Sequence, residues 1–184
     1  MKKYQIIYAD PPWKYGCWYK SEKVKRNAAD HYQVMSLQEL YMLGLKLKPF
    51  LAKDCALFMW VTFPCLKDGI RLLDGWGFKY KTVAFNWVKR NKRADTYFLG
   101  LGNYTRANSE IVLLGTRGRP LARRSRSVRQ ICDARIREHS QKPDEIKNRI
   151  VKLFGDLPRI ELFARERTFG WDVWGNEVES DIEL

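Results

Sequence analysis

The sequence contains few of the residues that build metal centres and disulfide frameworks. Its four cysteines, Cys17, Cys55, Cys65 and Cys132, are scattered without a Cys-x-x-Cys pair, and only two histidines are present. Structural zinc sites and disulfide-rich domains depend on closely spaced cysteines and histidines. The sequence therefore argues against a metal site and against a fold held together by disulfides.

Long apolar runs and glycine-rich nucleotide motifs are also absent. No window of about 18 uninterrupted apolar residues exists, and the N-terminal MKKYQIIYADPPW turns polar too early for a signal peptide. We therefore expect a soluble, cytoplasmic protein without membrane segments. The missing G-x-G-x-x-G motif argues against a nicotinamide-dependent enzyme.

The sequence does contain the ingredients of one globular α/β domain. Its 184 residues are 45% apolar and 30% charged, which suits a single domain over residues 1–184. Apolar patterns alternate between strand and helix, which indicates a mostly parallel sheet. The expected strands are 4–9, 55–61, 79–88, 110–116 and 159–164.

Three helices are expected between these strands. The first opens at the capping-box sequence Ser36-Leu37-Gln38-Glu39 and ends before Pro49, and the second ends at Gly75. The third covers residues 143–154, with Pro143 at its first helical position.

Positive charge is the strongest feature of the composition. The formal net charge is +13, from 34 Lys and Arg against 21 Asp and Glu, and the basic residues cluster in residues 14–33, 89–108 and 117–129. Such clusters favour nucleic acid as a binding partner, because basic side chains that bind phosphates release the counterions of the nucleic acid. A basic surface without a partner is the alternative. The candidate phosphate contacts are Lys23, Lys25, Arg26, Arg117, Arg119, Arg123, Arg124 and Arg126, and Trp18 and Tyr19 are candidate base-stacking residues.

The motif DPPW follows the first expected strand, 4–9. Asp10 ends that strand at the sheet edge where open α/β sheets bind ligands. Pro11 and Pro12 have no N–H, so the corner consists of acceptors, and we expect no competing donor near the Pro11 carbonyl. An aromatic amino group could donate one N–H to Asp10 and one to Pro11, with Trp13 stacking on the base. The alternative is an Asp-Pro turn followed by a core tryptophan.

Eight segments carry a resemblance to a known family. They are DPPW (10–13), HYQVMSLQEL (31–40), LFMWVT (57–62), WGF (76–78), WVK (87–89), REHSQKPDE (137–145), ELFAR (161–165) and GWDVWGNE (170–177). Together they resemble the adenine-N6 methyltransferases of the METTL type, and most closely the short bacterial and phage DNA members. The resemblance implies a Rossmann-like fold, S-adenosylmethionine as cofactor, and methyl transfer to the adenine amino group. Because DPPW precedes ELFAR, it also implies a circularly permuted order of motifs.

The resemblance also assigns roles to residues in the second half of the chain. Lys142 precedes a helix start, where a cation is disfavoured, so an anion should lie beside it. The resemblance makes that anion the carboxylate of the cofactor; a solvated neighbour of Asp144 and Glu145 is the alternative. The remaining cofactor candidates are Asp10, Phe163, Arg165, Asn176 and Glu177, and Tyr104 and Arg106 match a segment that flanks the target base.

Other interpretations stay open. Arg165 could form a surface ion pair, and Gly175-Asn176 a simple turn. The protein could methylate RNA, or it could be a catalytically silent nucleic-acid-binding partner subunit, although the intact DPPW corner argues against the latter. The sequence does not define the oligomeric state, so a homodimer or a partner subunit is also an open expectation.

Overall fold

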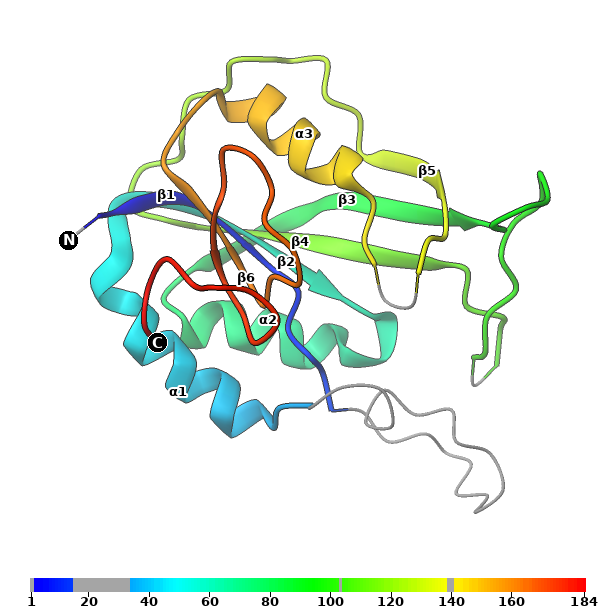
Figure 1. Ribbon diagram of the computed structural model, residues 1–184, viewed down its shortest axis with the longest axis horizontal. Coiled ribbons are helices and arrows are strands. Elements are labelled where there is room, and N and C mark those ends of the chain that lie inside the picture. The colour runs from blue at the N-terminus through cyan, green and yellow to red at the C-terminus, as the bar shows by residue number, and fades with distance from the viewer. Residues whose placement is uncertain (1, 15–33, 103, 139–140) are drawn as a thin grey trace.

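The computed structural model describes residues 2–14, 34–102, 104–138 and 141–184. A seven-stranded sheet with the order β5-β3-β4-β2-β1-β6-β7 forms its centre (Figure 1). The strands are β1 (Tyr4–Ala9), β2 (Leu51–Val61), β3 (Lys79–Arg90), β4 (Ser109–Arg117), β5 (Ile131–Arg135), β6 (Arg159–Leu162) and β7 (Asp172–Trp174). The helices are α1 (Leu37–Leu47), α2 (Leu66–Gly75) and α3 (Asp144–Phe154), with short 3-10 helices η2 (Lys48–Phe50) and η3 (Phe63–Cys65).

One strand of the sheet is reversed relative to the other six. β1, β2, β6 and β7 pair in parallel, and β3 pairs in parallel with β5. β4 lies between β2 and β3 and is antiparallel to both. The mostly parallel α/β fold expected from the sequence is confirmed, whereas the circular permutation stays a prediction.

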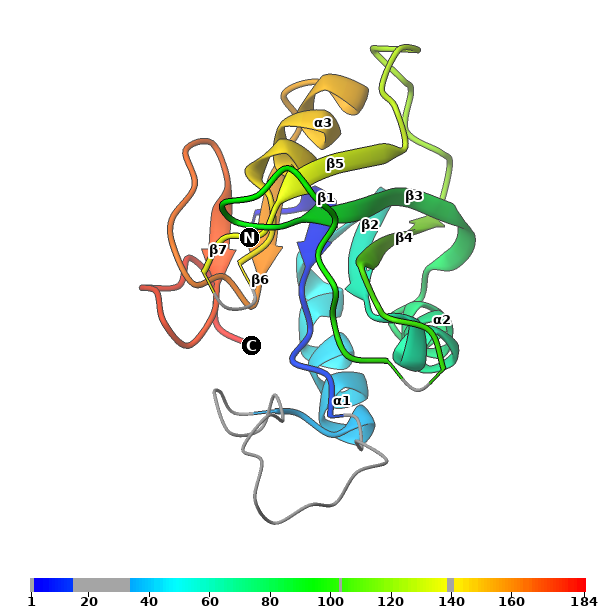
Figure 2. The same cartoon turned by 90° about the vertical axis from the view of Figure 1, so that its right-hand side faces the viewer.

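Helices cover both faces of the sheet. α1 and α2 pack on one face against alternate residues of the central strands, such as Ile7 and Leu57, and α3 packs on the other against Tyr8 and Phe58. Figure 2, turned by 90° from Figure 1, shows α3 on the opposite side of the sheet from these two helices. This two-sided cover explains why β1 and the second half of β2 are nearly continuously apolar.

The sequence located most elements, with three differences. β5 and β7 were not anticipated, because each is a short edge strand whose polar neighbours leave no apolar run. Pro143 is the N-cap of α3 rather than its first helical residue, so that expectation was wrong by one position. The capping box at Ser36 and Glu39 is confirmed, with both reciprocal hydrogen bonds present.

The reversal of β4 brings its first residues to the edge where the neighbouring strands end. Ile111 pairs with Val61, the last residue of β2, while Arg117 pairs with Cys55, six residues earlier in the same strand. Nine residues of strand cover about 26 Å. Glu110 therefore lies at the edge that also carries Asp10, and residues after Arg117 continue from the opposite edge.

In the described part of the chain, no helix is long and apolar enough to cross a membrane.

Candidate active site

The corner after β1 is held by backbone hydrogen bonds. The N–H of Trp13 donates to the Pro11 carbonyl over 2.8 Å, and the N–H of Met35 donates to the Pro12 carbonyl over 2.9 Å. The expectation that no donor competes for the Pro11 carbonyl was therefore wrong, since the turn itself supplies one. A carbonyl oxygen has two lone pairs, so Pro11 keeps capacity for a second hydrogen.

Trp13 is held in position by burial and by a hydrogen bond from its indole. Its side chain is buried, and Nε1 donates to the Trp60 carbonyl over 2.9 Å. Trp60 in turn donates from its indole to the Tyr8 hydroxyl over 2.5 Å. These bonds tie the corner to the two central strands, and Trp13 is thus both packed against the core and placed at the wall of a cavity.

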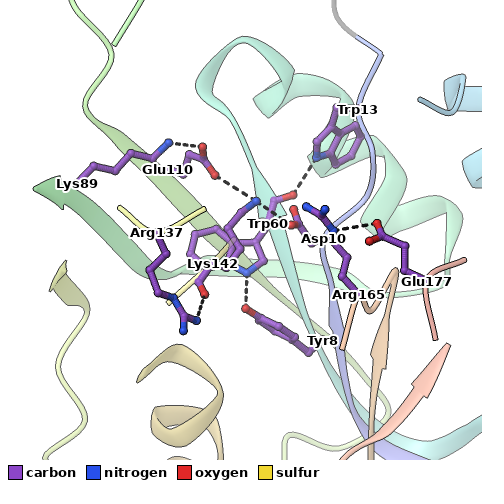
Figure 3. A network of polar contacts seen from close by, with 10 residues as sticks. All are labelled: Tyr8, Asp10, Trp13, Trp60, Lys89, Glu110, Arg137, Lys142, Arg165 and Glu177. Atoms are coloured by element: carbon purple, nitrogen blue, oxygen red, sulfur yellow. Dashed lines mark hydrogen bonds and ion pairs between the residues drawn. The ribbon is translucent and has the colours of Figure 1, made fainter. Parts of the chain in front are cut away.

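Four charged side chains form a chain of contacts beside the corner (Figure 3). Lys142 Nζ lies 2.7 Å from Asp10 Oδ2 and 3.5 Å from Glu110 Oε2, and Lys89 contacts the other oxygen of Glu110. Lys142 Nζ also lies 5.5 Å from the centre of the Trp60 ring. The side chains of Asp10, Lys142 and Glu110 are 29%, 13% and 18% exposed. Attraction between them is therefore only partly screened by water.

The two carboxylates of this network differ in their pKa. Burial raises the pKa of Asp10, and Lys142 opposes that rise. Burial also acts to raise the pKa of Glu110, but Lys142 and Lys89 together outweigh it and hold that pKa below its usual value. Glu110 is thus the stable counter-ion of the two lysines, whereas Asp10 is the carboxylate whose charge is less strongly supported.

A cavity of about 470 Å³ opens beside Asp10. Its walls are largely apolar, include five aromatic side chains, and come from the ends of several strands and the loops that follow them. Aromatic members of the lining are Trp13, Trp60, Phe63, Trp87 and Phe98. Such walls suit a flat heteroaromatic ring, and Asp10, Pro11, Glu110 and Lys142 supply the polar groups.

Several lining residues had no chemical role in the sequence-based interpretation. Trp60, Trp76 and Trp87 were expected as core or rim aromatics, and all three are buried. Trp60 and Trp87 nevertheless reach the cavity, together with Lys89. The WVK segment, residues 87–89, was the signal that could have identified two of them.

The candidate cofactor residues lie at the ends of β6 and β7. Phe163 is the one non-glycine residue with positive φ in the described chain, at 63°, and its ring packs on Trp174 at 5.4 Å between centroids. Arg165 Nε lies 2.8 Å from Glu177 Oε1, with both side chains half-exposed, so the ion pair considered as an alternative is present. Asn176 is exposed in the turn after β7.

Asp10 stands between two groups of charged residues. Figure 3 shows Lys142 and Glu110 on one side of it and the Arg165–Glu177 pair on the other. The 470 Å³ cavity includes Asp10 and Lys142 but not Phe163, Arg165, Asn176 or Glu177. The structure therefore brings the two sets to one sheet edge as neighbouring regions rather than one pocket.

The candidate nucleic-acid contacts are divided between different parts of the surface. Tyr104 and Arg106 are exposed on the loop that borders the cavity. The segment with Arg117, Arg119, Arg123, Arg124 and Arg126 starts at the far sheet edge and runs alongside α3 to β5 (Figure 1). Trp18, Tyr19, Lys23, Lys25 and Arg26 lie outside the described residues.

The cofactor carboxylate expected beside Lys142 stays a prediction, but the chain itself already places an anion there. It is Asp10, with Glu110 second, rather than Asp144, which instead accepts a hydrogen bond from Arg137 over 2.8 Å. No group of three or more His, Cys, Asp or Glu residues suited to a metal ion occurs in the described segments.

The sheet topology, the acidic corner at its carboxyl edge and the aromatic cavity define the class as a Rossmann-like methyltransferase. The MT-A70 family model matches residues 4–177, and the chain belongs to this family. The resemblance inferred from the eight sequence segments is therefore confirmed.

Curated relatives fall into two groups by length. The Type II methyltransferase M.MunI of Mycoplasma sp is 39% identical over 199 residues, covering 100% of this chain and 82% of the relative. The probable N(6)-adenosine-methyltransferase MT-A70-like protein of Oryza sativa is 30% identical over 96% of this chain. The human N(6)-adenosine-methyltransferase catalytic subunit METTL3 is 28% identical over the same share. This chain spans only 23% and 28% of those two longer proteins.

Proposed function

We propose that this protein transfers a methyl group from S-adenosylmethionine to the N6 amino group of adenine in DNA. The observation that carries the proposal is the position of the Asp10 carboxylate, which directly follows β1 and lines a cavity with aromatic side chains next to an acceptor carbonyl. DNA is favoured as the substrate because a Type II methyltransferase matches this chain over nearly its own length.

Adenine fits the donors and acceptors of the cavity. Its amino group carries two hydrogens, which Asp10 and the second lone pair of the Pro11 carbonyl would accept. Trp13 and the other aromatic walls would hold the ring flat. When both hydrogens are bound by these acceptors, the lone pair of the amino nitrogen points toward an electrophile. The amino nitrogen is then itself the nucleophile, and no protein nucleophile is needed.

Asp10 would contribute more in the transition state than in the ground state. Positive charge develops on the amino nitrogen as it attacks, and a fixed carboxylate in a partly dry site stabilises that charge. Positioning supplies the other large effect, since well-oriented reactants lower a barrier by roughly 7–11 kcal/mol.

The residues near Asp10 also fit a cofactor that carries an amino-acid end and a ribose. Lys142 would hold its carboxylate and Asp10 its ammonium group. Arg165 and Asn176, with Glu177 beside them, would hold the ribose. The positive φ of Phe163 points to a chain bent for such a ligand, because strained residues persist where the surroundings impose them. When bound, S-adenosylmethionine supplies the electrophilic methyl group.

Lys142 would change partners during the reaction cycle. It lies 2.7 Å from the same Asp10 oxygen that adenine or the cofactor ammonium would approach. Transfer of Lys142 to a cofactor carboxylate frees Asp10, while Glu110 keeps the lysine charge balanced at 3.5 Å.

A labelling experiment tests the proposal. The purified protein is incubated with methyl-labelled cofactor and, separately, duplex DNA, single-stranded DNA and RNA of one sequence, and the modified base is mapped. We expect label on adenine N6 in DNA. Label on cytosine, or on none of the three nucleic acids, contradicts the proposed chemistry. Label on RNA alone would mean that the substrate is RNA and not DNA.

Ligand binding is checked without turnover. S-adenosylhomocysteine should raise the melting temperature of the protein, because a ligand that binds only the folded state stabilises it. Absence of any shift at millimolar ligand would favour a plain nucleic-acid-binding module instead. Size-exclusion chromatography of the same sample tests whether the protein is a homodimer.

A further inference from the structure

The segment between β3 and β4 forms a fixed projection next to the cavity. Its backbone folds back on β3: the N–H of Phe98 donates to the Lys89 carbonyl over 2.8 Å, and Gly100 donates to Ala107 over 2.9 Å. Figure 1 shows this green segment extending beyond the end of β3. The segment is therefore an extension of the hairpin rather than a loose connection.

The two sides of this projection differ in what they face. Phe98, Gly100, Leu101 and Ala107 line the cavity beside Asp10. Apolar side chains nevertheless stand exposed on the same segment: Leu99 is 66% exposed, Leu101 62% and Tyr104 99%. Burial does not explain an aromatic ring that is 99% exposed, because it contributes nothing to the core.

The backbone of the projection is tightly turned at two glycines. A Cβ atom on Gly100 would lie 2.3 Å from the Ala107 carbonyl oxygen, and one on Gly102 would lie 1.9 Å from that of Thr105. Neither position accepts a side chain without moving backbone. The exposed apolar residues are thus carried on a closely folded turn, which suits insertion into a narrow space.

Two exposed arginines belong to the same segment as the exposed apolar residues. Arg93 and Arg106 are both exposed, and neither forms a salt bridge with any residue in the described segments. By contrast, Arg90 at the base of the same projection pairs with Asp133 and Asp95. Unpaired guanidinium groups on the same segment as exposed apolar side chains match a surface that has phosphates outside and stacked bases inside.

We propose that the exposed side chains of Leu99, Leu101 and Tyr104 form a wedge that enters the base stack of duplex DNA and fills the space left when the target adenine turns into the cavity. The proposal rests on the proposed function and specifies a duplex substrate. Tyr104 would stack on the neighbouring bases, and Leu101, at the cavity rim, would separate the duplex from the extruded base. Arg93 and Arg106 would contact phosphates of the same duplex.

The physical argument concerns access. Asp10 is only 29% exposed, at the rim of the cavity, so an adenine within a duplex cannot reach it while stacked and paired. Enzymes that act on a base must extrude it, and apolar side chains inserted between base steps favour the unstacked state. Because the wedge belongs to a segment that also lines the cavity, one segment would both separate the base steps and receive the extruded base.

The test compares substrates that differ in how much energy extrusion needs. Tyr104→Ala and Leu99→Ala, the latter at an exposed residue outside the cavity lining, are assayed on a duplex, on the same duplex with an abasic site opposite the target adenine, and on the single strand. We expect kcat/KM to fall about tenfold or more on the duplex and to stay within about twofold on the other two substrates. Tyr104→Phe should retain duplex activity, because stacking needs the ring and not the hydroxyl.

A second readout follows base extrusion without methyl transfer. A duplex with 2-aminopurine at the target position should gain fluorescence when the wild-type protein binds and gain little with Tyr104→Ala. Tyr80→Ala is the matched control, since Tyr80 is an exposed aromatic on β3 that pairs with Gly115 near the opposite sheet edge. It should leave both readouts unchanged.

Three results would overturn the wedge. One is an equal loss of activity on all three substrates, and another is undiminished duplex activity in both alanine variants. The third is a change in sedimentation on mutation, which would make these side chains a contact between protein chains. If the wild-type protein methylates no adenine in any substrate, that result contradicts the proposed function, and the wedge proposal fails with it.

Discussion

Lys142 Nζ lies 2.7 Å from Asp10 Oδ2, although the two residues are separated by 132 positions in the chain. The lysine precedes α3 and the aspartate ends β1, so the ion pair joins a helix start to the carboxyl edge of the sheet. Asp10 is less supported by positive charge than Glu110, which has two lysine partners. The ion pair links the charge state of Asp10 to the position of one lysine, and two of the predictions follow from it.

Replacing Asp10 by Asn should abolish most turnover and leave the fold intact. The amide is nearly isosteric but carries no charge to stabilise the amino nitrogen as it becomes positive. Loss of one such electrostatic contact lowers kcat by about 10²–10³-fold. The measurement is single-turnover methyl transfer at saturating cofactor, with Asp68→Asn on α2 as the control. Near-normal transfer by Asp10→Asn would show that the corner is not catalytic.

Replacing Lys142 by Met should move the acidic limb of the pH–rate profile to higher pH. Asp10 acts as a carboxylate, so activity falls as the pH drops through its pKa. Burial already raises that pKa and Lys142 opposes the rise, so removing the lysine raises the pKa further. The profile of kcat/KM for the cofactor measures the shift, because it reports the pKa of Asp10 in the free enzyme, where Lys142 still contacts it. Lys89→Met should shift the limb less, because Lys89 is the smallest contributor, and an unmoved limb in Lys142→Met would refute the coupling.

Replacing Lys147 by Met should destabilise the protein strongly. Lys147 Nζ lies 3.0 Å from Glu161 Oε2 and 2.6 Å from the Thr168 hydroxyl, and the lysine and glutamate side chains are 7% and 15% exposed. Removing one partner of a buried pair costs about 3–5 kcal/mol of unfolding free energy.

Urea denaturation measures this loss, and a second variant separates its cause. In the double variant Lys147→Met with Glu161→Leu, no buried charge is left unpaired, so most of the stability should return. A double variant as unstable as the single one would mean that packing, rather than the unpaired carboxylate, dominates. The pair matters for the site because Glu161 belongs to β6, which carries Phe163 at its end.

Replacing Arg123, Arg124 and Arg126 together by Gln should weaken the salt dependence of DNA binding. The segment that carries them is anchored, since the N–H of Arg124 donates to the Leu153 carbonyl over 2.8 Å, yet none of the three forms a salt bridge with a described residue. Each lost phosphate contact should reduce the slope of log K against log salt by about 0.9.

The control for this measurement removes the same charge elsewhere. Lys46, Lys67 and Arg71 lie on α1 and α2, across the sheet from the arginine segment. Their replacement by Gln should leave the slope nearly unchanged. Equal slopes in the two triple variants would mean that the arginine segment acts only through net charge.

The sequence by itself determined the secondary structure of the core and the identity of the reactive corner. Apolar runs such as Tyr4–Ala9 are long enough to be recognised locally, and the Ser36–Glu39 capping box fixes a helix start through bonds within one turn. DPPW was recognised for the same reason, since its acceptors are neighbours along the chain. These features depend on contacts between residues a few positions apart.

Only the tertiary structure decided which charges meet. Nothing local to Glu110 predicts Lys89 and Lys142 as partners, because the contacts follow from the reversal of β4 within an otherwise parallel sheet. The same reversal sends Arg117 to the edge opposite Asp10, so one basic cluster lies away from the corner although the sequence grouped them together. β4 is reversed because the chain returns along β3 as a hairpin, whereas its position between β3 and β2 depends on strand pairing between residues far apart in the chain.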